Sequence, residues 1–253
     1  MQKEFDLTGK KAVVTGAGRG LGRDIAVGLA RYGADVMLWA RTASELKETA
    51  QLVRAEGRQA WLETLDITDI KLTGEAAIRA AKTMGRVDIL INNAGTNKPQ
   101  PAENVDEAAF DQVMNINLKG AFFCAQAFGK IMIAQQGGKI VNVSSQSGKL
   151  ALLNRSVYCA SKGAVDQFTR VMAYEWAKYG ITVNAVAPTF VETNLTANML
   201  KDKAFNEYVF SKLRIQRLAK ASEVTAGVLY LVSPGADIVT GHILYIDAGW
   251  TIH

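Results

Sequence analysis

Two side chains in the second half of the sequence stand at a spacing that could support acid/base chemistry. Tyr158 and Lys162 are four residues apart, which places both on one face of a helix. A free tyrosine has a pKa of about 10, and a neighbouring ammonium group favours the phenolate and lowers that pKa. The pair could therefore give a proton to a developing alkoxide or accept one from an alcohol.

A glycine-rich segment near the start of the chain is the second chemical feature. Residues 15–22 read Thr-Gly-Ala-Gly-Arg-Gly-Leu-Gly, between an expected strand and an expected helix. Glycine lets the backbone turn tightly and approach a pyrophosphate closely, and the N-terminus of the helix offers free N–H groups. We expect a dinucleotide at this turn, and a tight turn without a ligand is the alternative. The Gly-x-x-x-Gly-x-Gly spacing differs from the Gly-x-Gly-x-x-Gly of larger dehydrogenases.

The end of the second expected strand bears on which dinucleotide binds. NAD-binding proteins usually place an Asp or Glu there, whereas this chain reads Leu-Trp-Ala-Arg over residues 38–41. Arg41, with Arg19 of the glycine segment on the other side, could hold a 2′-phosphate with a planar guanidinium. The sequence therefore favours NADP(H). Binding of NAD(H), with both arginines as surface groups, is the alternative.

Short apolar segments alternate with segments of helical period along the whole chain. This βαβ alternation predicts an α/β protein, with a doubly wound parallel seven-stranded sheet and helices on both faces. We expect one domain over residues 1–253. Residues 189–218 are less regular and follow the sixth strand, where loops carry the ligand in such sheets. They are predicted to form a substrate lid, with a pair of ordinary surface helices as the alternative. Strands are expected at residues 11–15, 35–39, 60–65, 87–92, 139–143, 181–186 and 242–246.

Composition excludes several other classes of function. The net charge of +5 is spread along the chain without a run of five basic residues, so we expect no nucleic-acid partner. No stretch of eighteen apolar residues occurs, so no membrane span is expected. Cys124 and Cys159 fit no metal-ligand spacing, and we expect no metal and a cytoplasmic location. His242 and His253 offer no base for a Ser–His–Asp hydrolase.

The motifs together resemble the classical branch of the short-chain dehydrogenase/reductase family, over nearly the whole chain. The resemblance is carried by residues 15–22, by the Asn-Asn-Ala-Gly turn at 92–95, and by Ser144-Ser145 thirteen residues before Tyr158. It implies a Rossmann-type fold and an NAD(P)-dependent oxidoreductase that transfers a hydride between nicotinamide and a carbonyl or secondary alcohol. The implied catalytic residues are Ser145, Tyr158, Lys162 and Asn117. Ser145 polarises the carbonyl, and Tyr158 is the general acid or base. Lys162 lowers the pKa of the tyrosine and binds the ribose, and Asn117 holds a relay water.

The resemblance also implies the contacts with the cofactor. Asp66 matches the family's adenine contact, Asn93 a contact near the ribose, and Thr193 a contact with the nicotinamide carboxamide. The family usually has Pro-Gly after the sixth strand, and here Thr189 is expected to reshape the pocket wall. The full implied set is Gly16, Gly18, Arg19, Gly20, Leu21, Gly22, Arg41, Asp66, Ile67, Asn93, Ala94, Gly95, Tyr158, Lys162, Pro188, Val191 and Thr193.

Polar residues near the reacting centre bear on the substrate. Asn97-Lys98 follows the Asn-Asn-Ala-Gly turn, with Lys98 three residues after Gly95, and Asn154-Arg155 ends three residues before Tyr158. Both pairs are expected to border the pocket, and Ser147 lies two residues after the catalytic serine. Such polarity suits a hydroxylated or carboxylated small molecule and resembles the branch acting on gluconate-type sugar acids. The alternatives are a 3-oxoacyl-carrier-protein reductase, a dinucleotide-binding regulator without catalysis, and simple surface polarity.

The expected quaternary structure follows from the same resemblance, because members of the family are commonly tetramers. The long helical segments 106–135 and 156–179 would form one interface. The C-terminal segment would form the other, with Trp250 and Ile252 as apolar surface exposed on a monomer. We therefore expect a homotetramer.

Overall fold

The computed structural model of the chain describes residues 3–192, 196 and 200–252. Seven apolar segments form one sheet, in the order β3-β2-β1-β4-β5-β6-β7, and each strand is parallel to its neighbours. The predicted doubly wound parallel sheet is thereby confirmed. The strands are β1 (Lys11–Thr15), β2 (Asp35–Ala40), β3 (Ala60–Thr64), β4 (Ile89–Asn92), β5 (Gly138–Val143), β6 (Ile181–Pro188) and β7 (Ile243–Ile246).

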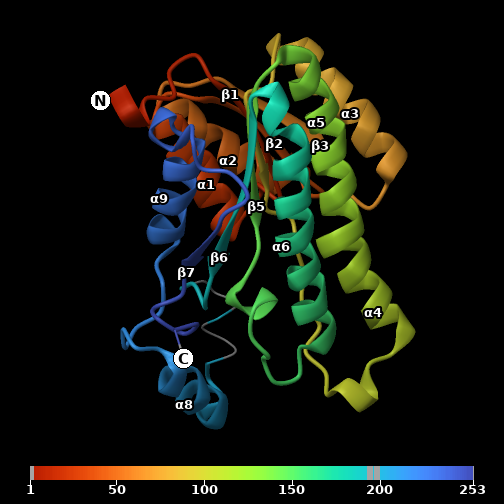
Figure 1. Ribbon diagram of the computed structural model, residues 1–253, viewed down its shortest axis with the longest axis vertical. Helices are drawn as coiled ribbons and strands as arrows, with labels where there is room; N and C mark the ends of the chain where they lie inside the picture. Colours follow the sequence, from red (N-terminus) through yellow and green to blue (C-terminus); the bar gives the residue numbers. More distant parts are fainter. Residues whose placement is uncertain (1–2, 193–195, 197–199, 253) are drawn as a thin grey trace.

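Helices cover both faces of the sheet, as predicted (Figure 1). One layer contains α1 (Gly20–Arg31), α2 (Ala43–Ala55) and α9 (Ala221–Val232), and the other contains α3 (Ile70–Met84), α5 (Ala121–Gln135) and α6 (Ser156–Trp176). Before α5 lie α4 (Glu107–Met114) and a π-helical turn, η3 (Asn115–Gly120). The short helix α8 (Lys203–Lys212) lies at the end of the molecule where strands β6 and β7 finish. Among the described helices, none is both long and apolar enough to cross a membrane.

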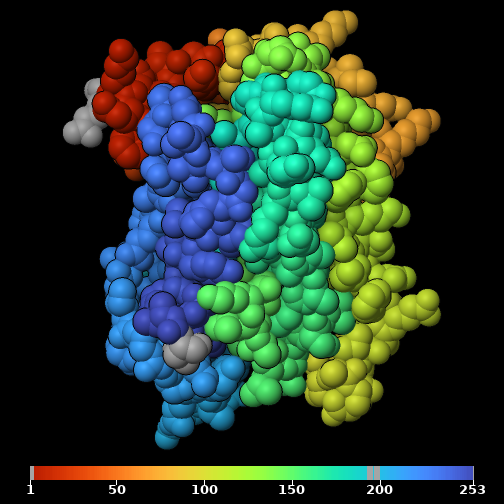
Figure 2. All heavy atoms as spheres, in the orientation of Figure 1, coloured from red at the N-terminus to blue at the C-terminus, as the bar shows by residue number. Residues whose placement is uncertain are grey.

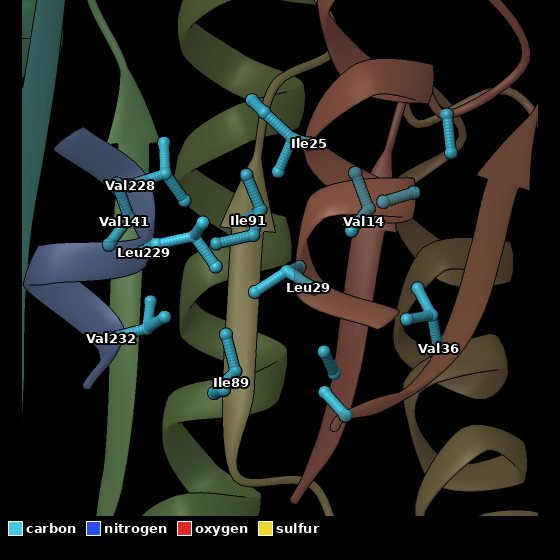
Figure 3. Close-up of a cluster of buried hydrophobic side chains, with 14 of the residues drawn as sticks. Val14, Ile25, Leu29, Val36, Ile89, Ile91, Val141, Val228, Leu229 and Val232 are labelled. Atoms are coloured by element: carbon cyan, nitrogen blue, oxygen red, sulfur yellow. The ribbon is translucent and has the colours of Figure 1, made fainter. Parts of the chain in front are cut away.

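The alternation of side chains along each strand divides the core into two layers. Val14 of β1 packs with Ile25 and Leu29 of α1 on one face, together with α9 (Figure 3). Its neighbour Val13 points to the other face and belongs to the cluster around Phe128 of α5. Because both faces of the five central strands are buried, the sequences of these strands are mostly apolar, which is what made them recognisable.

Trp250 does not lie where the sequence analysis expected it, and the prediction that it is exposed on a monomer is wrong. Its side chain is only 3% exposed. The ring centroid lies 5.8 Å from that of Phe190 and 6.2 Å from that of Tyr208 on α8. Trp250 is therefore covered by residues of the same chain. Ile252 is exposed, as predicted.

Described residues of the irregular segment 189–218 pack in one cluster with Trp250. Phe190 and Phe205 meet edge to face, with centroids 5.7 Å apart, and Val191 forms an isolated bridge with Ala219. On the face shown in Figure 2, residues near 150 lie beside the C-terminal segment, and Lys149 Nζ donates a 3.4 Å hydrogen bond to the main-chain oxygen of Thr251. Opening and closing of the segment as a lid stays a prediction.

The packing of α1 against α9 gives a test of the fold. A Cβ atom added at Gly28 would overlap Thr225 Cγ2 of α9. We expect Gly28→Ala to lower the free energy of unfolding by about 1–3 kcal/mol, because overpacking forces the helices apart. Gly74→Ala on α3 is the matched control, because an added Cβ there meets no atom within 4 Å and alanine is the better helix former. Urea denaturation of both variants measures the difference, and equal stability would contradict the close contact.

Candidate active site

Two glycines of the segment between β1 and α1, Gly16 and Gly22, leave no room for a side chain. Gly16 has a φ of +65°, and a Cβ atom there would lie 2.9 Å from Asn93 Nδ2 and 3.0 Å from Ala94 Cα. A Cβ atom at Gly22 would overlap the main-chain oxygen of Gly16. The first turn of α1 therefore packs directly on the loop, and its leading N–H groups, which have no helical partner, are left for a ligand.

The turn after β4 is fastened to this glycine loop. Thr15 Oγ1 accepts hydrogen bonds of 3.0 Å from the N–H groups of both Asn93 and Ala94. Asn93 Nδ2 donates to the main-chain oxygens of Thr15 and Gly16, at 3.0 and 3.3 Å. Asn93 thus holds the loop in shape. Thr15 was missed as a site residue, although it is a polar residue at the end of a buried strand.

A cavity of about 920 Å³ runs along the carboxyl ends of the strands. Its size lies within the range of about 300–1,000 Å³ usual for ligand sites. It is lined by these residues of the predicted site: Gly16, Gly18, Arg19, Gly20, Leu21, Gly22, Arg41, Asp66, Ile67, Asn93, Ala94, Gly95, Ser145, Ser147, Arg155, Tyr158, Lys162, Pro188 and Val191. Asn117 and Lys98 do not line it, and Thr193 lies outside the described residues. Asn97, of the predicted Asn97-Lys98 pair, lines the cavity. Lining residues that were not predicted include Glu45, Thr96, Gln146 and Phe190.

Two arginine–carboxylate pairs stand at the end of the cavity that holds β2. Arg41 Nη1 lies 3.6 Å from Asp66 Oδ2, and Arg19 Nη1 lies 3.5 Å from Glu45 Oε1. Burial alone would raise the pKa of Asp66, but hydrogen bonds from Thr68 and the charge of Arg41 hold that pKa below its ordinary value. Both predicted arginines therefore line the cavity, each already beside a carboxylate.

Lys162 is buried at the opposite end of the cavity, with only 5% of its surface exposed. Its Nζ donates a 2.7 Å hydrogen bond to the main-chain oxygen of Val143, at the end of β5. Burial lowers the pKa of the ammonium to about 8, and the charge of Asp166, one turn further along α6, opposes that shift. Lys162 is therefore poised to change charge within the working range of an enzyme.

Tyr158 lies one helical turn before Lys162, whose Nζ is 5.7 Å from the centre of its ring. Burial raises the pKa of the phenol, while a hydrogen bond with Ser145 and the positive charge of Arg155 act in the opposite direction. The lowering of this pKa by Lys162 stays a prediction. In the structure, the cation whose charge opposes the effect of burial on the pKa of Tyr158 is Arg155.

Ser145 and Asn117 complete the predicted catalytic set. Ser145 Oγ donates to Gln146 Oε1 at 2.8 Å and accepts from the N–H of Ser147 at 3.2 Å. Asn117, in the π-helical turn, accepts from the N–H of Thr96 at 2.7 Å and donates to its carbonyl oxygen at 2.8 Å. Asn117 therefore acts on the cavity through the backbone of Thr96, and its predicted hold on a water stays a prediction.

The two candidate substrate cations differ in position. Arg155 lines the cavity and is 6% exposed. Its guanidinium carbon lies 5.0 Å from the centre of the Phe205 ring on α8, and Nη1 donates to the main-chain oxygen of Leu153 at 3.0 Å. Lys98 is exposed and lies outside the cavity wall. The prediction from the spacing to a motif therefore placed one of these two cations, Arg155, on the cavity wall.

The buried ammonium of Lys162 gives the protein without cofactor a measurable pH dependence. Its pKa is lowered from 10.5 to about 8, so between these values the folded protein has lost a proton that the unfolded chain keeps. The free energy of unfolding of the wild type, relative to Lys162→Met, should therefore rise by up to about 3 kcal/mol from pH 7 to pH 10.5. Urea denaturation of both proteins at several pH values measures this. A constant difference would show that the buried lysine carries no such shift.

Comparison with known proteins agrees with this geometry. Residues 10–204 match the family model for short chain dehydrogenases. The chain is 36% identical to gluconate 5-dehydrogenase of Gluconobacter oxydans, over 98% of this chain and 97% of that protein. It is 39% identical to an NAD-dependent glycerol dehydrogenase of Listeria innocua, over 99% and 97% of the two chains. The crystal structure of a gluconate 5-dehydrogenase from Burkholderia cenocepacia in complex with NADP and tartrate superposes with a TM-score of 0.95, at 33% identity, over 99% of this chain and 98% of that one. The chain belongs to the short-chain dehydrogenase family of nicotinamide-dependent oxidoreductases.

Proposed function

We propose that this enzyme interconverts a carbonyl and a secondary alcohol on a small sugar acid, with NADP(H) as cofactor. The observation that carries the choice of substrate is Arg155, a buried guanidinium on the cavity wall that forms no ion pair within the described residues. A buried charge without a counter-ion is costly, and a substrate carboxylate supplies the counter-ion. The likeness to gluconate 5-dehydrogenases supports the same class of substrate.

The cavity has the features that a dinucleotide requires. The glycine loop, into which a Cβ atom would not fit, suits a pyrophosphate. At the adenosine end β2 finishes in Ala40, with no carboxylate, and Arg41 and Arg19 line the wall. These cations support NADP(H) over NAD(H), as does the bound NADP of the Burkholderia cenocepacia enzyme. The bound nicotinamide supplies or accepts the hydride.

The protein side chains handle the proton and the position of the substrate. Ser145 donates a hydrogen bond to the substrate oxygen, and Tyr158 gives a proton to that oxygen in reduction or takes it in oxidation. The ammonium of Lys162 stabilises the phenolate that reduction leaves behind. Asn117 fixes the turn at Thr96, so the wall beside Lys162 stays in place through the proton transfer.

We further infer that the enzyme works as a homotetramer in the cytoplasm. Tyr174 of α6 is 89% exposed, and Val171 of the same helix is 44% exposed, which gives this helix an uncovered apolar side. Ile252 adds an exposed apolar group at the C-terminal segment. Both cysteines are free thiols, which suits a reducing compartment.

A comparison of an acidic and a neutral substrate tests the proposed function. We expect the wild type to reduce 5-keto-D-gluconate with NADPH, and Arg155→Met to lower kcat/KM for it by roughly 10- to 150-fold, the equivalent of a charge-assisted hydrogen bond. Reduction of the neutral dihydroxyacetone should change little. Lys98→Met, at a cation outside the cavity, is the matched control, and Tyr158→Phe should lower both activities by about 10²–10⁴-fold. Equal losses on both substrates in Arg155→Met would rule out the carboxylate contact.

The choice of cofactor is tested at the end of β2. We expect Arg41→Ala to lower kcat/KM with NADPH by roughly tenfold or more, because a guanidinium–phosphate contact is lost, and to leave kcat/KM with NADH nearly unchanged. The double change Ala40→Asp with Arg41→Ala should move the preference to NADH. Initial rates at varied cofactor concentration give these ratios. A wild-type enzyme that favours NADH would refute the assignment.

A further inference from the structure

Three buried oxygen atoms on the cavity wall have no hydrogen-bond partner within the described residues. They are Asn97 Oδ1, Ser147 Oγ and Thr189 Oγ1. Each belongs to a turn that follows a different strand, namely β4, β5 or β6, and these three strands are neighbours in the sheet. Buried polar atoms in proteins are nearly always paired, and leaving one unpaired costs about 1–3 kcal/mol. Three such atoms on one cavity indicate a ligand with hydroxyl groups.

Thr189 is held firmly while its hydroxyl stays unpaired. Its main-chain N–H donates to the oxygen of Ile246 at 3.2 Å, which continues the pairing of β6 with β7. The residue is 7% exposed. Thr189 thus presents a fixed hydroxyl on the cavity wall.

Ser147 places a second hydroxyl beside the reacting centre. The residue is 3% exposed, and its N–H donates to Ser145 Oγ at 3.2 Å. In the proposed mechanism Ser145 donates a hydrogen bond to the reacting oxygen of the substrate. A group bound by Ser147 therefore lies close to the reacting carbon.

We propose that Thr189 and Ser147 together bind a hydroxyl on the carbon next to the reacting carbon, and so select α-hydroxy ketones and vicinal diols. The inference rests on the proposed function, because it takes Ser145 and Tyr158 as the groups that meet the reacting oxygen. A hydroxyl both donates and accepts hydrogen bonds, so one substrate hydroxyl satisfies both side chains. A methyl group in its place leaves both unpaired.

Two ketones of the same shape separate this contact from general activity. Acetoin and 3-methyl-2-butanone differ only in a hydroxyl replaced by a methyl group. We expect the wild type to favour acetoin in kcat/KM, and Thr189→Val, which keeps the shape and removes the hydroxyl, to reduce that preference by about tenfold. Thr189→Ser should keep the preference, and Ser147→Ala should reduce it. Thermal unfolding confirms that each variant is folded.

The outcomes distinguish this inference from the proposed function. An unchanged preference in Thr189→Val, with both ketones turned over, overturns the hydroxyl site and leaves the proposed function standing. A reduced preference together with no reduction of 5-keto-D-gluconate supports the hydroxyl site and rejects the sugar acid. If the wild type turns over none of the three carbonyl compounds, the proposed function fails and the inference fails with it.

Discussion

The ammonium group of Lys162 donates a hydrogen bond to the main-chain oxygen of Val143, where β5 ends. All seven strands run in one direction, so their carboxyl ends meet at one edge of the sheet. A long helix that crosses this edge brings its side chains to turns that come from distant parts of the sequence. The contact from Lys162 joins α6 to that edge, and the hydrogen bond from Ser144 Oγ to Asp166 joins them a second time. Together these contacts hold Tyr158 of α6 beside the turn that carries Ser145.

The burial of this ammonium is offset by a carboxylate on the same helix. Asp166 lies one turn beyond Lys162 and accepts a 2.5 Å hydrogen bond from Ser144 Oγ. A Cβ atom at Gly148 would lie 2.6 Å from Asp166 Oδ2, so the turn that carries Ser145 passes directly over the carboxylate. Asp166 therefore does two things: it opposes the loss of charge on Lys162, and it holds the turn that presents the serine.

The sequence predicted well what depends on local period and on glycine. The five central strands are buried on both faces and form apolar runs, and the edge strands β3 and β7 are short apolar segments that are only partly buried. All seven were recognised, with ends that differ by a residue or two. The glycine loop was recognised because its residue types are required by the closeness of Asn93 to Gly16. Both features can be recognised from a few neighbouring residues in the sequence.

Contacts between segments that are distant in the sequence cannot be predicted from such local patterns. Trp250 is buried by Phe190 and Tyr208, which lie more than forty residues away in an irregular segment, and nothing in its own neighbourhood indicates this. Arg155 and Lys98 each stand three residues from a motif, yet only Arg155 lines the cavity. Spacing gives the distance along the chain, whereas the direction of a side chain depends on the tertiary packing, here on Phe205 of α8.

The adenosine end of the cavity shows why cofactor choice cannot be read from one residue. Arg19 and Arg41 already stand beside Glu45 and Asp66, and such exposed pairs are worth only about 0–1 kcal/mol. Either arginine can therefore exchange its carboxylate partner for a phosphate at a small cost in free energy. Glu45 itself packs on Gly18, where an added Cβ would lie 2.9 Å from its Oε2, so a phosphate entering here meets a carboxylate as well as two cations. Selectivity for NADP(H) is then the difference between these opposing charges, and the missing carboxylate at Ala40 is one part of that balance.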